Sequence, residues 1–474
     1  MFSLKQIRSS RRWIGASMGW MLVASAWGQN LQVFHDAALS NDAQWRAAGH
    51  ALEAARQRPG QARAALLPQL SYVATRHDQR GTLYFADEAP TEKDVEARTR
   101  ALQLTQGIIR PEQWMALRQA NAQEAHALAQ FEVARQQATV RIVQAYLDAW
   151  VAQESVRLVR SQLKAFEAQL ELAQRNFKVG ATTITDVHEA QAKRDLGLAQ
   201  SIAAENELQA RLTELERLTG RVPDAIHGLR EDAPPPGSDA AALADWVERA
   251  RQLQPEVLMA QAGLGIAETE QARYRAALLP TLDLTLKKGT DQSTGSVTAP
   301  TDVPYRNRTT QALLTLNWPI FEGGRSYYQM REAAASLDRA QAELDGAQST
   351  ATSTVRQSYM GLRSSSAQVK ALMSARVSSL NALEASRVGY RIGTRINLDV
   401  LNAESQHVTV QRDLAKARAD AVMHWVRLQA ATGELSPEVV TQINDWLAPE
   451  GQAVAMDPAF STAASTAMNQ EKIQ

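Results

Sequence analysis

The chain has 474 residues, with 51 Lys and Arg, 51 Asp and Glu, and no cysteine. This balance of charge indicates no surface for nucleic acid, and no RNA- or DNA-binding motif is present. The lack of cysteine excludes disulfides, thiolate metal sites and cysteine nucleophiles. The length would suit two or three ordinary domains, but a duplication that spans most of the chain indicates one body built from two similar halves.

The N-terminus has the three-part layout of a secretory signal peptide. Basic residues precede an apolar stretch over 13–23, and small residues follow at 24–28. The stretch is shorter than the roughly 20 residues that a membrane span needs, which makes an N-terminal anchor the weaker alternative. We predict a signal peptide over residues 1–26, with cleavage between 26 and 28.

The first half then predicts a helix followed by two strands. Residues 31–66 are rich in alanine, and Pro68 ends the helix because proline disfavours helical geometry in the residue before it. Apolar residues alternate with polar ones from Leu70, and again from Leu102, on either side of a polar segment at 77–100. We expect strands of about eight to ten residues joined by an exposed loop.

The second half repeats this order. Residues 275–280 are identical to 63–68, and leucines alternate with polar residues from Leu282. A loop rich in Gly, Ser and Thr (289–309) leads to a second alternation that ends at Trp318. Each strand has an apolar and a polar face, as a strand between lipid and a watery lumen would have.

A duplicated turn interrupts the two long proline-free runs, 112–222 and 320–436. Residues 177–187 and 390–400 align without a gap and share a glycine, Gly180 and Gly393, and a later Asp-Val pair. Glycine takes the left-handed conformation that ends a helix. Four side chains are candidates to cap the helix after the first turn: Thr182, Thr183, Thr185 and Asp186. We predict two long helical hairpins.

Each arm of these hairpins is too long for a compact domain. An arm of about 65 residues extends roughly 100 Å at 1.5 Å per residue. In the first arm, one narrow apolar stripe follows helical spacing: Leu163, Phe166, Leu170, Ala173 and Phe177. The pattern is typical of a coiled-coil-like arm.

These patterns divide the chain into a first repeat (31–220), a linker (221–255), a second repeat (256–433) and a tail (434–474) whose end we expect to be disordered. The fold class is mainly α with a small β part. Four strands leave two unpaired edges, and in lipid each unsatisfied backbone group costs several kcal/mol. Three copies would supply twelve strands and close a transmembrane β-barrel, continued by an α-barrel of long helices.

The chain resembles the TolC family of outer-membrane channel proteins over about residues 31–435. The resemblance depends on the duplicated turns, the paired Ala-Ala-Leu-Leu-Pro segments and the segment 318–325, Trp-Pro-Ile-Phe-Glu-Gly-Gly-Arg. It implies a homotrimer in the outer membrane of a Gram-negative bacterium, with a long periplasmic extension and no catalytic activity. The linker and the tail would form an equatorial region around the helices.

The family also implies a gate at the periplasmic tip, formed by the turns. Tyr390 and Arg395 match residues that bond to the first turn, and Thr185 and Asp186 match their partners. Such bonds would hold the tip shut, and a docking partner would release it. Capping of the helices alone is the simpler role for Asp186.

Asp399 matches a family position whose carboxylates form a ring at the constriction and favour cations. The family often has a second Asp one turn later, where this chain has Asn402. This difference halves the expected charge of the ring. Capping alone is again the simpler role for Asp399.

The expected function is a passive exit duct that works with a periplasmic membrane-fusion adaptor and an inner-membrane pump. The chain is similar to the type I secretion branch, with an ABC transporter and a protein cargo, and the toxin exporters of that branch, the cyclolysin exporter among them, are the members we would name. A small-molecule efflux duct with an antiporter is the alternative, although the lipidated multidrug subgroup has an N-terminal Cys that this chain lacks. The alternative of another class is a periplasmic coiled-coil adaptor.

Other signals are weak. Gly263 and Gly265 resemble part of a dinucleotide motif, but no strand precedes them. The histidines are scattered without metal-ligand spacing, and there is no nucleophile elbow or phosphate loop. We therefore expect no enzyme activity, cofactor or metal.

Overall fold

The structure is a computed structural model that describes residues 31–84, 89–221, 223, 226–231, 233, 236 and 242–447. The expected signal peptide (1–26) and the disorder expected at the end of the tail lie outside the described residues. The elements follow in this order: α1 (Leu31–Asn41), α2 (Ala43–Arg56), α3 (Arg58–Ala64), β1 (Gln69–Leu83), β2 (Thr91–Ile109), α4 (Pro111–Lys178), α5 (Ile184–Thr219), α6 (Leu243–Leu253), α7 (Pro255–Ala276), β3 (Thr281–Ser293), β4 (Tyr305–Asn317), α8 (Arg325–Arg391), α9 (Asn397–Ala431) and α10 (Pro437–Asp445).

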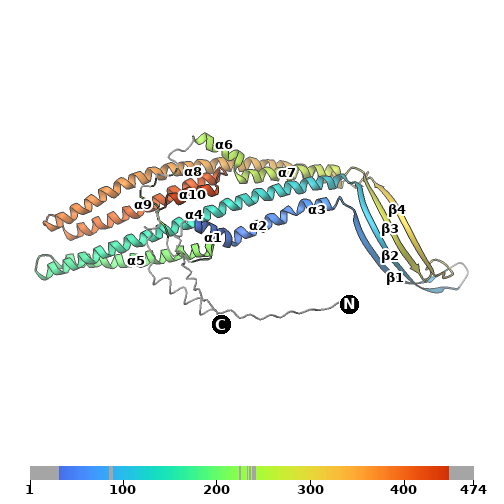
Figure 1. Ribbon diagram of the computed structural model, residues 1–474, viewed down its shortest axis with the longest axis horizontal. Coiled ribbons are helices and arrows are strands. Elements are labelled where there is room, and N and C mark those ends of the chain that lie inside the picture. The colour runs from blue at the N-terminus through green and yellow to red at the C-terminus, as the bar shows by residue number, and fades with distance from the viewer. Residues whose placement is uncertain are drawn as a thin grey trace, which may run out of the picture.

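The molecule is elongated, with the sheet at one end and two helical hairpins that extend to the other (Figure 1). The long arms α4 and α8 have 68 and 67 residues, so each is roughly 100 Å long. Each arm has shorter helices beside it: α5 and α3 contact α4, and α9 and α7 contact α8. The expectation of a mainly helical fold with long arms and two repeated halves is confirmed.

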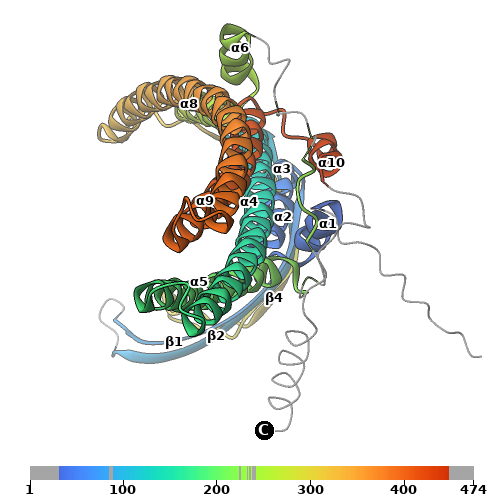
Figure 2. The same cartoon turned by 90° about the vertical axis from the view of Figure 1, so that its left-hand side faces the viewer.

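Four helices form a curved wall in the order α8, α9, α4, α5 (Figure 2). Adjacent pairs in this order are in contact, and the contact between α4 and α9 joins the two repeats. The wall therefore has α5 of the first repeat at one side and α8 of the second repeat at the other. No helix in the described part of the chain is long and apolar enough to cross a bilayer.

The four strands form one antiparallel sheet in the order β1-β2-β3-β4. Its two edges are β1 from the first repeat and β4 from the second. The hairpin of β1 and β2 extends beyond the rest of the sheet, because β3 ends at Ser293 opposite Ala97 while β2 pairs with β1 up to Thr91.

The strands are longer than the alternation predicts, with 13 to 19 residues each. The predicted loop 77–100 is wrong for most of its length, and the predicted loop 289–309 is shorter, because β3 continues to Ser293 and β4 begins at Tyr305. The reason lies in cross-strand charge pairs between β1 and β2. Arg76 Nε lies 3.2 Å from a carboxylate oxygen of Glu96, and Arg80 Nε donates to Asp94 at 2.9 Å. Such pairs stabilise a strand pair that has little apolar surface.

The predicted single helix over 31–66 is also wrong, since the segment forms α1, α2 and α3 with breaks at Asp42 and Gln57. Asp42 caps α2 by accepting the backbone N–H of Gln44 at 3.0 Å, and its carboxylate binds Arg141 of α4. A buried carboxylate needs such partners. Asp42 thus starts a new helix and fastens it to the first arm.

The main core lies midway along the helices, where α1 and α6 pack against the arms and α10 packs against α1. Tyr146 of α4 is fully buried; its hydroxyl donates to the carbonyl oxygen of His227 at 2.9 Å and accepts the His227 backbone N–H at 3.0 Å. Burial raises the pKa of Tyr146. The described part of the linker is therefore held against the first arm by one side chain that satisfies both backbone groups of His227.

Candidate functional site

The two hairpin turns lie at the end of the molecule that is farthest from the sheet (Figure 1). Gly180 and Gly393 have φ angles of 75° and 80°, a backbone conformation that residues with a side chain rarely adopt. In the first turn, the N–H of Ala181 donates to the carbonyl of Asn176 at 2.8 Å; in the second, the N–H of Thr394 donates to that of Gly389 at 2.9 Å. Both arms therefore end with the same pattern of closing bonds.

The first turn ends in a complete capping box at the start of α5. Thr183 is the N-cap: its hydroxyl accepts the backbone N–H of Asp186 at 3.3 Å, and the Asp186 carboxylate accepts the backbone N–H of Thr183 at 3.1 Å. The hydroxyls of Thr182 and Thr183 donate to the same carboxylate. These three bonds to the side chain all end on Oδ2, so the Asp186 carboxylate is oriented by its own turn.

The second turn has a weaker cap. Ile396 stands where the first turn has Thr183, so there is no capping hydroxyl. The Asp399 carboxylate accepts the backbone N–H of Ile396 at 3.3 Å and lies 3.7 Å from a guanidinium nitrogen of Arg395. Fewer of its lone pairs are used, and about a third of its side chain is exposed.

Arg395 is positioned by a glycine. A Cβ at Gly389 would lie 2.7 Å from Cγ of Arg395, so only a residue without a side chain lets Arg395 fold over the end of α8. Its side chain is 59% exposed. The guanidinium is therefore held at the surface of the tip, where another chain could reach it.

Tyr390 joins the two arms: its hydroxyl accepts a hydrogen bond from Nδ2 of Asn176 at 3.4 Å. Within the described part of this single chain, neither Tyr390 nor Arg395 is bonded to Asp186. Thr185 and Asn402 are exposed. The bonds that the family implies between the turns remain a prediction.

Two buried residues near the turns were missed by the sequence analysis. Asn397, at the start of α9, is 1% exposed, and its Oδ1 accepts from the Gln169 side chain of α4. Leu401, one turn later, packs into a cluster with Phe166, Leu170 and Val187 of the first hairpin. The sequence did contain one indication of this contact: a polar residue, Asn397, stands at the position where the first repeat has the apolar Ile184. Phe177, the last residue of the apolar stripe predicted for the first arm, is not buried, since 43% of it is exposed.

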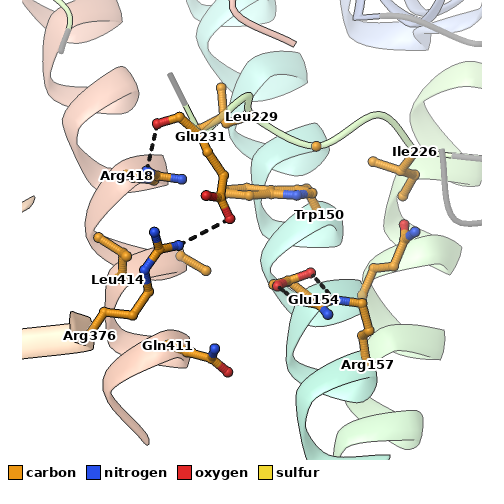
Figure 3. Close-up of a pocket in the computed structure, with 13 residues that line it drawn as sticks. Trp150, Glu154, Arg157, Ile226, Leu229, Glu231, Arg376, Gln411, Leu414 and Arg418 are labelled. Carbon is orange, nitrogen blue, oxygen red and sulfur yellow. Dashed lines mark hydrogen bonds and ion pairs between the residues drawn. The ribbon is translucent and has the colours of Figure 1, made fainter. Parts of the chain in front are cut away.

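A second candidate is a cavity of about 360 Å³ at mid-length, between α4, α9 and the linker (Figure 3). Its charged groups have partners within the cavity wall. Glu154 binds Arg157, the Glu231 carboxylate accepts from Arg376 at 3.0 Å, and the Glu231 carbonyl accepts from Arg418 at 3.0 Å. Burial lowers the pKa of Arg418. These bonds fasten the linker to α8 and α9, so we assign the cavity a structural role.

The cap of α5 predicts a pH dependence of the first turn. The Thr182 hydroxyl, with the backbone and hydroxyl of Thr183, holds the pKa of Asp186 below its ordinary value of 3.8. The stabilisation is complete above pH 3.8 and is lost as the pH falls through the lower pKa of the folded state. The N–H groups of Thr183 and Asp186 donate in the capping box, so their amide protection factors, corrected for intrinsic exchange, should fall between pH 4 and pH 2. Asp186→Asn should remove this pH dependence. A variant whose protection factors fall with pH as those of the wild type do would contradict the assignment.

Both halves of the chain are similar to known proteins. Residues 35–221 and 246–434 match the family described as "Outer membrane efflux protein". The chain is 30% identical to the alkaline protease secretion protein AprF of Pseudomonas aeruginosa over 437 residues (90% of this chain, 89% of AprF). It is 28% identical to the proteases secretion protein PrtF of Dickeya chrysanthemi over 417 residues (86% of this chain, 89% of PrtF).

Among solved structures, the outer membrane protein VceC of Vibrio cholerae has the same fold, with a TM-score of 0.71 at 19% identity (85% of this chain, 96% of VceC). The match in both halves excludes the periplasmic adaptor that the long hairpins alone left open. The chain belongs to the TolC family of outer membrane efflux proteins of Gram-negative bacteria, and it is a transport protein without enzymatic activity.

Proposed function

We propose that three copies of this chain form the exit duct of a tripartite protein export system, closed at the tip by the duplicated turns. The observation that carries the proposal is the match between two sets of free edges. The sheet ends in β1 and β4, and the helical wall ends in α5 and α8. In both layers one free edge comes from the first repeat and the other from the second.

The same threefold rotation can therefore complete both layers. It would pair β1 with β4 of a neighbouring copy, giving twelve strands, and place α5 beside its neighbour's α8. In lipid this pairing is required, because unsatisfied backbone N–H and C=O groups each cost several kcal/mol. The helices would then continue the lumen of the strands into the periplasm.

The tip would act as the gate. Arg395 is exposed and has a long contact with Asp399, so it is free to reach the Asp186 carboxylate of the neighbouring copy as a charge-assisted link. Tyr390 would add a bond to the first turn. Three Asp399 carboxylates would form a ring that favours cations, to which Asn402 adds no charge.

The cargo is inferred from the named relatives. AprF and PrtF are described as protease secretion proteins, which favours type I secretion of a protein, with a membrane-fusion adaptor and an ABC transporter as partners. Within that class, a protease fits these relatives better than the toxin cargo that the sequence suggested. Small-molecule efflux with an antiporter is the second candidate, because the family is defined as efflux proteins.

Disulfide crosslinking tests the trimer, since the chain has no cysteine of its own. Val73→Cys on β1 is combined in turn with Thr309→Cys, Gln311→Cys and Leu313→Cys on β4, because these residues lie on the same face of the sheet. One pairing should bring the two Cα atoms within about 7 Å and give dimers and trimers on non-reducing gels. Val73→Cys alone is the control. Monomers in all three pairings would exclude β1–β4 closure.

Single-channel conductance in planar bilayers tests the gate. Asp186→Ala with Arg395→Ser should raise the conductance sharply, because charge-assisted bonds worth about 1.5–3 kcal/mol each are lost and the open population rises at least about tenfold.

The matched control is Thr183→Ala with Arg391→Ser. It removes the capping hydroxyl and an exposed arginine at the same helix ends, but it keeps both members of the proposed link. Equal conductance in the two double variants would show that loosening of the turn, rather than the link, opens the tip.

Complementation separates the two cargo classes. The chain is expressed in a Gram-negative strain that lacks its own type I exit duct but keeps the adaptor and the ABC transporter. We expect secreted protease activity to return, while a strain lacking its small-molecule efflux duct should continue to accumulate fluorescent dye. The reverse result would replace protein secretion with efflux.

A further inference from the structure

One face of the sheet changes from apolar to basic along the strands. The register aligns the even-numbered residues of all four strands on this face. The rows nearest the helices are mostly apolar: Leu282 and Leu316; Gln106, Leu284 and Leu314; Leu70, Leu104, Leu286 and Ala312. This is the face that the proposed duct turns toward lipid, so the inference rests on that proposal.

The next three rows carry six cations. The register places Lys288 beside Leu102 in the first row, Arg100 and Arg308 on either side of Thr290 in the second, and Arg76, Arg98 and Arg306 in the third. All six cations are exposed. We call this set the basic belt.

Among the described residues, acidic partners reach only two cations of the belt, Arg76 and Arg98. These two share the carboxylate of Glu96 in the next row, and Arg76 Nε also lies 3.3 Å from the carboxylate of Asp78. Within the part of the chain that the structure describes, Arg100, Lys288, Arg306 and Arg308 form no ion pair. The two aspartates of β3, Asp283 and Asp291, have odd numbers and lie on the opposite face.

The position of the belt fits the polar boundary of a membrane. Trp318, just past the end of β4, and Arg308 are ten residues apart, which is about 34 Å along a strand and about 26 Å across a bilayer at a tilt near 40°. An apolar band in such proteins is about 25 Å tall. Exposed aromatic residues mark the other boundary: Trp318, Phe321, Tyr327 and Tyr328. The belt therefore lies at the boundary away from the helices, which is the outer leaflet in the proposed orientation.

The spacing suits a phosphate group. Arg100 and Arg308 are two strands apart, so their Cα atoms are about 10 Å apart, and both long side chains can converge above the Thr290 hydroxyl. A guanidinium donates two parallel hydrogen bonds to the oxygens of a phosphate group. An apolar or neutral headgroup cannot accept this charge-assisted pair of bonds.

We propose that the basic belt binds the phosphorylated headgroup of an outer-leaflet lipid, namely lipopolysaccharide, with Arg100 and Arg308 as the central pair and Lys288 and Arg306 beside them. Charge complementarity selects this occupant. The belt faces lipid rather than the lumen, it carries four cations without ion pairs, and it lies at headgroup depth. Binding would attach the duct to its own leaflet around the circumference of the barrel.

Binding of purified lipopolysaccharide to the full-length trimer in detergent tests the proposal. The measurement is the dissociation constant by microscale thermophoresis, at low and at high salt. Arg100→Gln with Arg308→Gln should weaken binding at least about tenfold, because charge-assisted contacts to phosphate are lost, and should reduce the salt dependence. Arg100→Lys with Arg308→Lys should retain most of the affinity if the charge suffices, and less if the bidentate geometry matters.

Neighbouring lysines supply the matched control. Lys288→Gln removes a cation from the belt, whereas Lys287→Gln removes one from the opposite face of the same strand. Only the first should weaken binding. Equal loss in both variants, or equal affinity for dephosphorylated lipopolysaccharide, would overturn the proposal.

Different experiments test the lipid-binding belt and the proposed duct, so failure of one proposal can be distinguished from failure of the other. If the belt does not bind lipopolysaccharide, the crosslinked trimer and its conductance are unaffected. If the chain forms no trimer, the crosslinking experiment shows that first. A belt variant that yields no heat-resistant trimer is replaced by Arg306→Gln near the start of β4, which should weaken binding several-fold relative to the unmodified chain.

Discussion

Backbone hydrogen bonding at the edges of the sheet is the constraint on which the rest of this structure depends. β1 and β4 each present one row of N–H and C=O groups that no strand in the described part of the chain pairs. A barrel has no edges, whereas an open four-stranded sheet in lipid leaves both rows unsatisfied. The helical wall is also open at two edges, α5 and α8. The proposed assembly around a single axis would relieve both layers, and it would explain how a duplicated chain with no closed core at either end is stable.

The duplication is symmetric in backbone and asymmetric in chemistry. Both turns use a glycine with a left-handed φ and the same closing bonds. The carboxylate of the following helix then meets a different partner in each copy: the hydroxyl of Thr182 in the first, and the guanidinium of Arg395 at the corresponding position in the second. The first turn is therefore a satisfied cap, whereas the second presents a cation. The proposed gate, in which turns of the two kinds alternate around the axis, would depend on this difference.

The sheet shows how polar residues can extend a strand. The β1–β2 hairpin continues past the apolar rows through cross-strand pairs such as Arg80–Asp94, and these paired charges suit water rather than lipid. Arg100 and Arg308 lie nearer the helices on the same face and form no ion pair within the described part of the chain. Paired charges at the top and unpaired cations below them together define where the polar boundary of the membrane meets the protein.

The sequence by itself determined the duplication, the long arms, their reversal at Gly180 and Gly393, and the two faces of the strands, because these follow from local periodicity and backbone preference. It also supported the family, through the order and spacing of its motifs. Tertiary structure decided what depends on neighbours in space. The strands extend through residues that appeared to be loop because Asp94 lies opposite Arg80 and Glu96 lies diagonally across from Arg76. Asp42 divides the first helix because Arg141 of α4 is there to bind it. Asn397 and Tyr390 meet Gln169 and Asn176 across more than two hundred residues of chain, and no local pattern encodes such a pairing.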